Sequence, residues 1–364
     1  MAFFENIFIE TYRCVSNLKL DNLRRINLIV GMNNCGKTSV LEAIQLLRSS
    51  DDLSNIYIIA RQRDTLSYMN SNSIFNNFIC MFSKDDLEEK RIAVSGSLNG
   101  RYISYDLTGR MNNVLLEPDE IRAIRNRQME IPDGDVLAES FDGMIRLKYL
   151  GITETPVQVN QYSLVASKAS SNRTSFNIVY VSPFDHLKGS IINKIIRNDE
   201  YKMICLKALQ LFDPDIEDMM IFQSDTGNRP VEYLRHKKLG DMPLSSYGDG
   251  IKKVLSLSNS IAKASDGILL IDEIETSIHK KYYDDIFRFL VKASKKFNVQ
   301  VFITTHSIEA IDGLLATQDY DLQKDSDDIC TCTIRKTQDG SLSRVLSGRE
   351  VYENREAFGF EVRQ

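Results

Sequence analysis

Apolar residues in the first fifty positions predict three strands and then a helix. Short apolar runs stand at residues 7–9, 18–20 and 26–30. The third run, INLIV, is almost wholly apolar, which is typical of a strand buried on both faces of a sheet. A glycine-rich loop follows this run, and we expect a helix from Lys37 to about Arg48.

The last third of the chain alternates between helical and strand patterns. Residues 250–264 and 279–297 place apolar side chains at helical spacing, so each predicts an amphipathic helix. Residues 268–271 and 299–304 are short apolar runs that indicate buried strands. Strand, helix and strand at this spacing predict a parallel crossover unit.

The middle of the chain has a weaker pattern. Residues 91–107 alternate and contain Asn99-Gly100, a dipeptide that favours the tight turn of a hairpin. We therefore expect an antiparallel β lobe at about residues 85–110. The pattern then fades until an apolar strand at Ile178–Val181.

Composition and charge narrow the class of protein. Hydrophobic residues make up 43% of the chain and charged residues 26%, as in an ordinary soluble globular protein. No apolar run approaches the ~20 residues of a membrane helix, and the start lacks the pattern of a signal peptide. The six cysteines form no CxxC pair, so we expect free thiols, a cytoplasmic location and no membrane.

Two basic clusters stand against a net charge of −5, which gives no general attraction to nucleic acid. Arg122, Arg125 and Arg127 form the first cluster, and residues 235–238 (RHKK) form the second. A solvated surface or a contact with double-stranded DNA explains such clusters, and we favour the solvated surface.

The loop after the third strand matches a phosphate-binding motif in full. Residues 31–38 read GMNNCGKT and fit G-x-x-x-x-G-K-[ST] between a strand and a helix. Such a loop turns backbone N–H groups toward phosphates, its lysine faces the β- and γ-phosphates, and its threonine hydroxyl binds Mg²⁺. The candidate ATP-binding residues are Gly31, Asn33, Asn34, Cys35, Gly36, Lys37, Thr38 and Ser39, with Thr38 also a metal ligand.

Two acidic residues follow the apolar strand at residues 268–271. Ligands bind at the carboxyl ends of strands in open α/β sheets, so Asp272 is placed to hold Mg²⁺, directly or through water. Glu273 is placed to orient or deprotonate the attacking water. The alternative is that the pair only caps a helix.

Two further motifs surround this acidic pair in the sequence. His306 follows the strand at residues 299–304, where a histidine can hydrogen-bond a γ-phosphate. Together with the two residues argued above, this makes Glu273, His306 and Lys37 the candidate catalytic residues. Ser246 and Gly248 precede a predicted helix, and a hydroxyl with exposed N–H groups at a helix start makes an anion site. The same turn can also serve as a simple helix cap.

Together these segments resemble the ABC-type ATPase heads of the SMC, RecF and OLD (overcoming lysogenization defect) group, and the short OLD-like AAA ATPases most closely. The similarity lies in an opening at residues 12–43, a signature at 244–250, a Walker B and D-loop at 271–279, a switch at 304–307 and a closing segment at 349–363. The resemblance implies an α/β P-loop ATPase head with a mixed central sheet, an antiparallel β lobe and a helical insertion.

On this basis we expect one ABC-type ATPase domain over residues 1–364. Residues 1–110 would form an N-terminal lobe with the phosphate-binding loop and the β lobe. Residues 111–240 would form the helical insertion. Residues 241–364 would hold the signature, the acidic pair and the switch histidine.

The resemblance also implies how the site is assembled. In the family, two heads enclose two ATP molecules, so a homodimer or a larger oligomer is expected. Ser246 and Gly248 would then act on the ATP of the other head, and His306 would be the switch. Arg13 is similar to a family arginine near the nucleotide and joins the candidate ATP-binding residues.

The chain departs from the family pattern in three places. Asp249 stands where Gln or Glu is usual, Ile274 stands where Pro often follows the acidic pair, and no Q-loop glutamine can be placed. These departures remove no core catalytic group, and slow turnover would be compatible with them.

Three functions remain open. The chain has no long heptad arm for rod-like tethering, and the stretch after His306 does not suit a TOPRIM nuclease domain. The first function is an ATP-dependent sensor or assembly platform that controls a separately encoded effector, a nuclease or toxin, in bacterial anti-phage defence. The second is a RecF-like ATPase that binds double-stranded DNA in repair. The third is an ATP-bound scaffold that hydrolyses ATP weakly.

Overall fold

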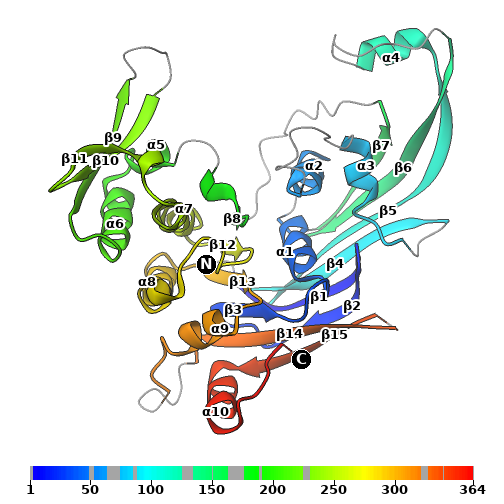
Figure 1. The fold of residues 1–364 in the computed structure, drawn as a ribbon. Coiled ribbons are helices and arrows are strands. Elements are labelled where there is room, and N and C mark those ends of the chain that lie inside the picture. Colours follow the sequence, from blue (N-terminus) through cyan, green and yellow to red (C-terminus); the bar gives the residue numbers. More distant parts are fainter. Residues whose placement is uncertain are drawn as a thin grey trace.

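The computed structural model describes residues 3–48, 53–63, 74–84, 88–124, 134–149, 151–162, 176–187, 191–223, 230–320, 327–338 and 340–363. Three sheets and the helices around them make up this part of the chain (Figure 1).

A mixed six-stranded sheet lies at the centre of the molecule. Its neighbouring strands are parallel except for the antiparallel pair β14 and β15. In spatial order the strands are β15 (Gly340–Ser347), β14 (Ile329–Thr337), β3 (Ile26–Val30), β13 (Gln300–Thr304), β12 (Ile268–Ile271) and β8 (Ile178–Val181). β3, β12 and β13 are buried along their whole length, which explains their unbroken apolar runs. Because these strands are parallel, their carboxyl ends meet at one edge of the sheet.

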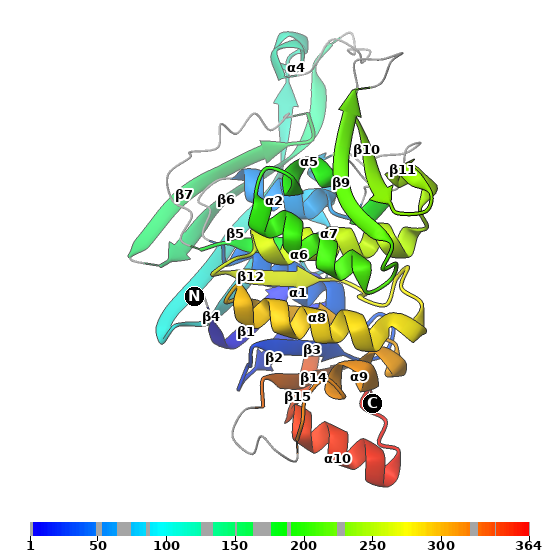
Figure 2. The same cartoon turned by 90° about the vertical axis from the view of Figure 1, so that its left-hand side faces the viewer.

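Helices cover both faces of the central sheet. On one face lie α1 (Lys37–Leu46), α2 (Leu53–Arg61) and α3 (Ile74–Ile79). On the other lie α6 (Asp199–Gln210), α7 (Asp249–Lys263), α8 (Tyr283–Lys296), α9 (Ile308–Leu315) and α10 (Gly348–Phe358). Helices α6, α7 and α8 pack side by side (Figure 2), and the predicted crossover from β12 through α8 to β13 is confirmed.

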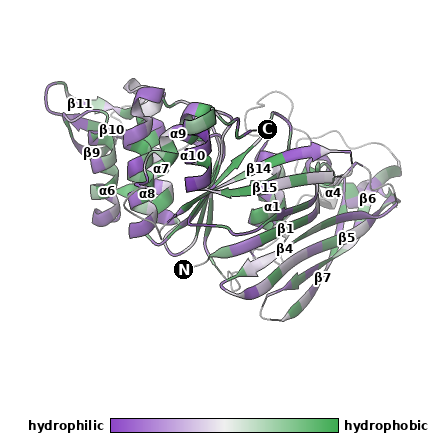
Figure 3. Ribbon diagram, turned by 90° about the horizontal axis from the view of Figure 1, so that it is seen from below, coloured by the Kyte–Doolittle hydropathy of each residue, from purple (hydrophilic) through white to green (hydrophobic). Residues whose placement is uncertain are grey.

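Neighbouring residues of one strand face different cores. On β12, Ile268 and Leu270 pack toward α1, whereas Leu269 and Ile271 pack toward the helices of the opposite face. The helices on that opposite face carry both hydrophilic and hydrophobic stretches, as amphipathic helices do (Figure 3). This two-sided burial fixes the register of the strand ends that hold the site.

The β lobe is larger than the sequence predicts. It is a six-stranded antiparallel sheet whose strands, in spatial order, are β2 (Val15–Leu20), β1 (Phe4–Tyr12), β4 (Lys90–Leu98), β5 (Arg101–Leu116), β6 (Val136–Lys148) and β7 (Ile152–Asn160). The predicted Asn99-Gly100 turn joins β4 to β5, and both residues have positive φ, at 52° and 72°. The lobe therefore extends beyond residues 85–110 in both directions along the chain.

The alternation that would reveal this longer lobe is interrupted by glycines. Gly109 and Gly143 are cross-strand partners on β5 and β6. A Cβ on Gly109 would lie 2.4 Å from Cζ of Phe141, so this ring covers the glycine pair. Beyond the glycines, β5 and β6 continue as an arm with α4 (Pro118–Ile124) at its end (Figure 1).

The stretch expected to be a helical insertion contains strands as well as helices. It includes β6, β7, β8 and most of a three-stranded antiparallel sheet, β9 (Ile216–Gln223), β10 (Pro230–His236) and β11 (Gly240–Pro243). Its helices are α4, α5 (Ile192–Ile195), α6 and the short 3₁₀ helix η1 (Asp185–Leu187). Two further 3₁₀ helices, η2 (Leu244–Ser246) and η3 (Lys280–Tyr282), follow this stretch. No helix in the described ranges combines the length and the hydrophobicity that a membrane span needs.

Candidate ATP site

The phosphate-binding loop is built tightly into the sheet between β3 and α1. Gly31 has φ +152°, and a Cβ there would lie 2.4 Å from the carbonyl oxygen of Ile334 on β14. Gly36 has φ +100°, and its Cβ would lie 2.6 Å from Cγ2 of Val15 on β2. Both positions therefore require glycine. The buried Cys35 side chain packs beside Gly31.

Lys37 is turned back onto this loop. Its Nζ donates hydrogen bonds to the carbonyl oxygens of Gly31 (2.9 Å) and Met32 (3.1 Å). Asn33 and Asn34 are exposed, and Asn34 has φ +64°, a conformation that asparagine adopts more readily than most residues. The ammonium group is thus held at the loop whose backbone N–H groups suit phosphates.

Asp272 is the centre of a hydrogen-bonded network at the strand ends. It directly follows β12 and is 4% exposed. Its carboxylate accepts hydrogen bonds from Thr38 Oγ1 (3.2 and 3.0 Å), Thr304 Oγ1 (2.5 Å) and the hydroxyl of Tyr180 (3.2 Å). The phosphate-binding loop and the strand that ends at Asp272 therefore meet. Their hydroxyl and carboxylate oxygens are ligands that suit Mg²⁺.

Burial and hydrogen bonding act in opposite directions on this carboxylate. Burial raises the pKa of Asp272 because it disfavours the charged form. The hydrogen bonds from Thr304, Thr38 and Tyr180 lower it again, because they stabilise the carboxylate. A cation at this position would act in the same direction as the hydrogen bonds.

Glu273 has a fixed backbone and an accessible carboxylate. Its N–H donates to Thr304 Oγ1 (2.8 Å), and its φ of +46° is uncommon outside glycine. The carboxylate accepts a long hydrogen bond from the hydroxyl of Thr276 (3.5 Å) and is partly exposed. This arrangement suits a general base that must meet a water molecule.

His306 lies in the loop between β13 and α9 and is held by Glu275. The His306 N–H and Nδ1 each lie 2.9 Å from Glu275 Oε1. The side chain of Glu275 is 11% exposed and that of His306 is 51% exposed. The contact engages Nδ1 and leaves Nε2 as the ring nitrogen for a ligand.

The signature-like turn stands apart from these groups. Ser246 ends η2 and Gly248 is the N-cap of α7, and both are exposed. Neither makes a hydrogen bond to the phosphate-binding loop within the described residues. Asp249, at the first position of α7, pairs with Lys252 at 3.1 Å. The structure therefore brings Lys37, Thr38, Asp272, Glu273 and His306 to one sheet edge and does not join Ser246 or Gly248 to them.

Arg13 belongs to a charged cluster around α1. Its Nε lies 2.8 Å from Oε2 of Glu42, which is fully buried and also accepts a hydrogen bond from the hydroxyl of Tyr12 (3.1 Å). Arg63 Nε lies 2.7 Å from the other oxygen of Glu42, and Arg63 Nη2 donates to Ser39 Oγ (2.9 Å). The hydroxyl of Ser39 is therefore engaged by an arginine next to the phosphate loop.

A cavity of about 620 Å³ opens beside this cluster. Arg13, Cys14 and Ser39 line one side, and the hairpin between β14 and β15 lines another with Lys336 and Gln338. The volume lies within the range of small-molecule sites and would accommodate the nucleoside part of ATP. Arg13 thus stays a candidate ATP-binding residue at the nucleoside end of the site.

A model of the AAA domain family described as "putative AbiEii toxin, Type IV TA system" matches residues 109–312, which is more than half of the chain. The chain belongs to this family. The match includes the signature-like turn, Asp272, Glu273 and His306, and the complete phosphate-binding motif lies before it. With that motif joined to Asp272 through Thr38, the protein is a P-loop ATPase.

Several proteins resemble this chain along most of its length. An ATP/GTP phosphatase of Helicobacter pylori is 24% identical over 346 residues, which cover 87% of this chain and 89% of that protein. The DNA replication and repair protein RecF of Staphylococcus carnosus is 23% identical over 363 residues, covering 84% of this chain and 93% of the relative. A crystal structure of the SmcHead bound to the C-winged helix domain of ScpA is 12% identical, with a TM-score of 0.51, and covers 96% of this chain and 99% of its own. The last likeness shows that the chain has an SMC-head type of α/β fold, as the sequence predicts.

Sequence reasoning missed two side chains that hold the acidic pair in place. Thr304 was noticed only as part of a motif, yet it binds both Asp272 and the N–H of Glu273. Tyr180 belongs to the predicted apolar strand at Ile178–Val181, and its hydroxyl binds Asp272. Both lie at carboxyl ends of parallel strands, so the rule that located Asp272 would have found them.

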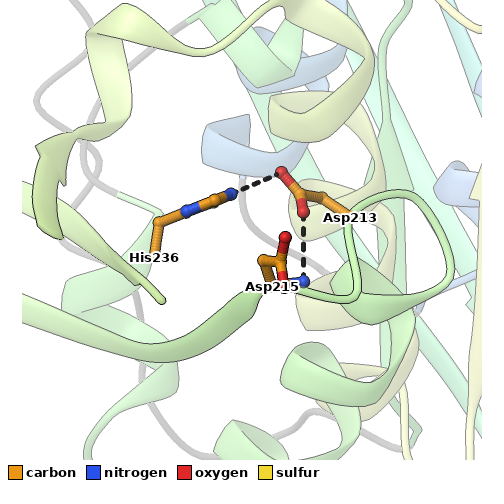
Figure 4. A group of neighbouring side chains, drawn as sticks. All are labelled: Asp213, Asp215 and His236. Carbon is orange, nitrogen blue, oxygen red and sulfur yellow. Dashed lines mark hydrogen bonds and ion pairs between the residues drawn. The ribbon is translucent and has the colours of Figure 1, made fainter. Parts of the chain in front are cut away.

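A second polar cluster, outside the ATP site, joins Asp213, Asp215 and His236 (Figure 4). His236 Nδ1 accepts hydrogen bonds from the N–H groups of Lys238 and Leu239 (3.1 Å each), so the proton of the neutral ring lies on Nε2. Nε2 then carries the proton, lies 3.3 Å from Asp213 Oδ2 and has no lone pair for a metal ion. The cluster is therefore a structural link between the turn before β9 and the end of β10.

The basic cluster at residues 235–238 is largely neutralised by acidic partners. Arg235 pairs with Asp241 at 3.0 Å, and Lys238 pairs with Asp215 at 2.5 Å. The second of these contacts lowers the pKa of Asp215. This pairing agrees with the solvated surface that the sequence favours. In the other cluster, Arg125, Arg127 and the side chain of Arg122 lie outside the described residues.

Proposed function

We propose that this AAA ATPase is a nucleotide-driven switch. Two copies would join around bound ATP, and the ATP-bound assembly would control a separately encoded effector, a nuclease or toxin, in bacterial defence against phage. The observation that supports the proposal best is the division of the site. Lys37, Thr38, Asp272 and Glu273 form a connected group at one sheet edge, whereas the Ser246–Gly248 turn is exposed and makes no described contact with it.

Each group of the connected half has a role that its geometry suits. Lys37 would hold the β- and γ-phosphates. Thr38 and Asp272 would hold Mg²⁺, which when bound supplies positive charge to the phosphate oxygens. Glu273 would take a proton from the attacking water, because its carboxylate is accessible while its backbone is fixed.

The exposed turn would complete the site of a second copy. A hydroxyl at Ser246 and the N–H groups at the start of α7 form an anion-binding helix terminus. α7 has fifteen residues and is buried along most of its length, so this terminus is rigidly placed. Bound ATP would then join two chains, and hydrolysis would release them.

Two observations support control of a separate effector, and the family description, "putative AbiEii toxin, Type IV TA system", supports a role in a toxin–antitoxin system. The SmcHead structure shows, for that protein, a head of this fold bound to a domain of another protein. On the present chain, Leu115 and Leu137 are cross-strand partners on the projecting arm, and each is 64% exposed, so the arm offers an apolar surface to a partner.

A RecF-like function in DNA repair is the second candidate. It is favoured by the Staphylococcus RecF relatives, which match along most of the chain. Duplex DNA should then stimulate ATP turnover, and the stimulation should fall steeply as salt is raised, because counterions are released on binding.

The deciding experiment is steady-state ATP hydrolysis with and without linear duplex DNA, with Glu273→Gln as the inactive control. Turnover that depends on Glu273 and ignores DNA supports the effector-controlling switch. In parallel, the protein encoded beside this one would be co-expressed, and its capture by the Glu273→Gln variant would be measured with ATP and with ADP. DNA-stimulated turnover without ATP-dependent capture would favour the RecF-like function instead.

A further inference from the structure

Both polar backbone atoms of His306 are held by side chains from distant segments. Its N–H donates to Glu275 Oε1 at 2.9 Å. Its carbonyl oxygen accepts a hydrogen bond from Nη1 of Arg363, also at 2.9 Å. Glu275 follows the acidic pair closely, so this contact comes from within the site. Arg363 lies 57 residues further along the chain, at the end of the closing segment, and the sequence motifs do not indicate its contact with His306.

Arg363 is itself presented in a fixed orientation. Its Nε and Nη2 bind the two carboxylate oxygens of Glu361, at 2.7 and 2.8 Å. This two-point contact orients the planar guanidinium group and leaves Nη1 for the carbonyl of His306. The Arg363 guanidinium also holds the pKa of Glu361 at about 2, so the pair stays charged at neutral pH.

Residues 361–363, which carry this pair, are anchored beside β3, the strand that precedes the phosphate-binding loop. Val362 is fully buried in the same apolar core as Val30, the last residue of β3. The carbonyl oxygen of Val362 accepts a hydrogen bond from Thr333 Oγ1 on β14 (2.7 Å), and Thr333 is the register partner of Val30. The segment therefore reaches from β14, on one side of β3, to the loop after β13, on the other.

We infer that Arg363, oriented by Glu361, is a positioning residue for ATP hydrolysis that acts through His306. It fixes the backbone of the loop, so that the imidazole keeps one orientation while its Nδ1 is bound to Glu275. Arg363 does not touch the nucleotide. The inference rests on the proposed function, in which His306 contacts the γ-phosphate.

The test compares ATP turnover by Arg363→Ala, Arg363→Lys and Glu361→Gln with that of the unchanged protein. We expect Arg363→Ala to lower kcat about tenfold with little change in KM, since small misplacements of catalytic groups cost this much or more. Lysine can reach one acceptor but cannot bind both carboxylate oxygens of Glu361. The kcat of Arg363→Lys should therefore lie between that of Arg363→Ala and that of the unchanged protein. Arg349→Ala, which removes an arginine of α10 that contacts Tyr320 instead, should leave kcat unchanged.

A double-mutant cycle separates positioning from a general structural effect. If Arg363 acts through His306, Arg363→Ala should lower kcat no further in a His306→Ala background. Equal losses in both backgrounds, or an unchanged kcat in Arg363→Ala, would overturn the inference. If His306→Ala itself leaves kcat unchanged, the proposed switch role of His306 fails instead, so the two failures are distinguishable. Thermal unfolding of each variant would show that the chain is folded.

Discussion

The two halves of the candidate ATP site differ in how firmly one chain holds them. Asp272 alone joins four elements, since it follows β12 and accepts hydrogen bonds from residues of α1, β8 and β13. The turn at Ser246 and Gly248 is exposed, and Asp249 beside it makes only a local ion pair with Lys252 within the described residues. We call the group around Asp272 the organised half, because the fold brings it together. We call the turn at Ser246 and Gly248 the presented half, because it is exposed on the surface.

This difference shows what a single parallel sheet can and cannot arrange. The groups of the first half all lie at neighbouring strand ends, so folding the sheet brings them together. The signature-like turn begins a helix on one outer face, and it makes no hydrogen bond to the phosphate-binding loop within the described residues. In the proposed dimer, this helix start would bind the phosphate of a second copy.

Glu273→Gln should have the largest effect on the organised half. The change keeps the shape of the side chain and removes the group that would take a proton, so kcat should fall at least about 100-fold. Binding of a fluorescent ATP analogue should persist, because the phosphate loop is untouched. Glu309→Gln removes the same charge from an exposed position on α9 and should be active. Normal turnover in Glu273→Gln would mean that another group activates the water.

Ser246→Arg tests the presented half, and it should lower ATP turnover nearly as much as Glu273→Gln does. Ser246 is exposed, so a large side chain should leave folding intact and block only the approach of a second copy. Asn113→Arg adds the same charge at an exposed position of β5, outside the signature-like turn, and is the control.

Mixing two inactive variants sharpens this test. Lys37→Ala keeps its signature turn and Ser246→Arg keeps its phosphate loop, so a mixed pair contains one intact composite site. Equal amounts should recover a measurable share of the ATP turnover that each variant lacks alone. Failure to recover any turnover, with both variants folded, would argue that one chain builds the whole site.

Thr304→Val should have an intermediate effect, because it loosens the organised half without removing a catalytic group. It deletes the hydroxyl that binds Asp272 and accepts from the N–H of Glu273. We expect kcat to fall about tenfold and the free energy of unfolding to fall by about 1–3 kcal/mol, because buried polar groups lose their partner. Both are measurable by steady-state kinetics and denaturant unfolding.

Thr331→Val is the control for this substitution. Thr331 is also buried in a strand of the central sheet, and its hydroxyl has no hydrogen-bond partner among the described residues. The same exchange there should leave both stability and turnover close to those of the unchanged protein. A similar loss in the two variants would indicate that valine disturbs the sheet and that the network at Asp272 is not the cause.

The sequence predicts the organised half well because its signals are local. INLIV followed by GMNNCGKT places a strand, a loop and a helix without reference to the rest of the chain, and Gly31 and Gly36 have the backbone angles that such a loop needs. The strand before Asp272 is equally local. The rule that strand ends meet at one edge then suffices to bring Asp272 near Thr38.

The sequence fails where the structure depends on partners far apart in the chain. Nothing near Glu42 indicates that Arg13 and Arg63 both bind it, and nothing near Arg363 indicates a contact with His306. The sequence predicts too short a β lobe for a related reason. Gly109 and Gly143 break the alternation, and their pairing becomes visible only across two strands.

Asp249→Gln should have the smallest effect, and it concerns the presented half. Asp249 stands at the start of α7, where the related families usually have Gln or Glu, and its side chain is 52% exposed beside Lys252. If this helix start faces the γ-phosphate of another copy, one negative charge there opposes the approach. Removing it should raise turnover by about two- to fivefold at low salt, since exposed charges interact weakly.

Salt and a matched control decide whether that rise comes from the interface. The gain should shrink as ionic strength increases, because exposed charges are screened within about 10 Å at 0.1 M salt. Asp241→Asn removes one negative charge from β11, where the side chain pairs with Arg235, and should give no gain. An equal gain in both variants would reflect net charge alone, and a salt-independent gain would point to a change in the turn itself.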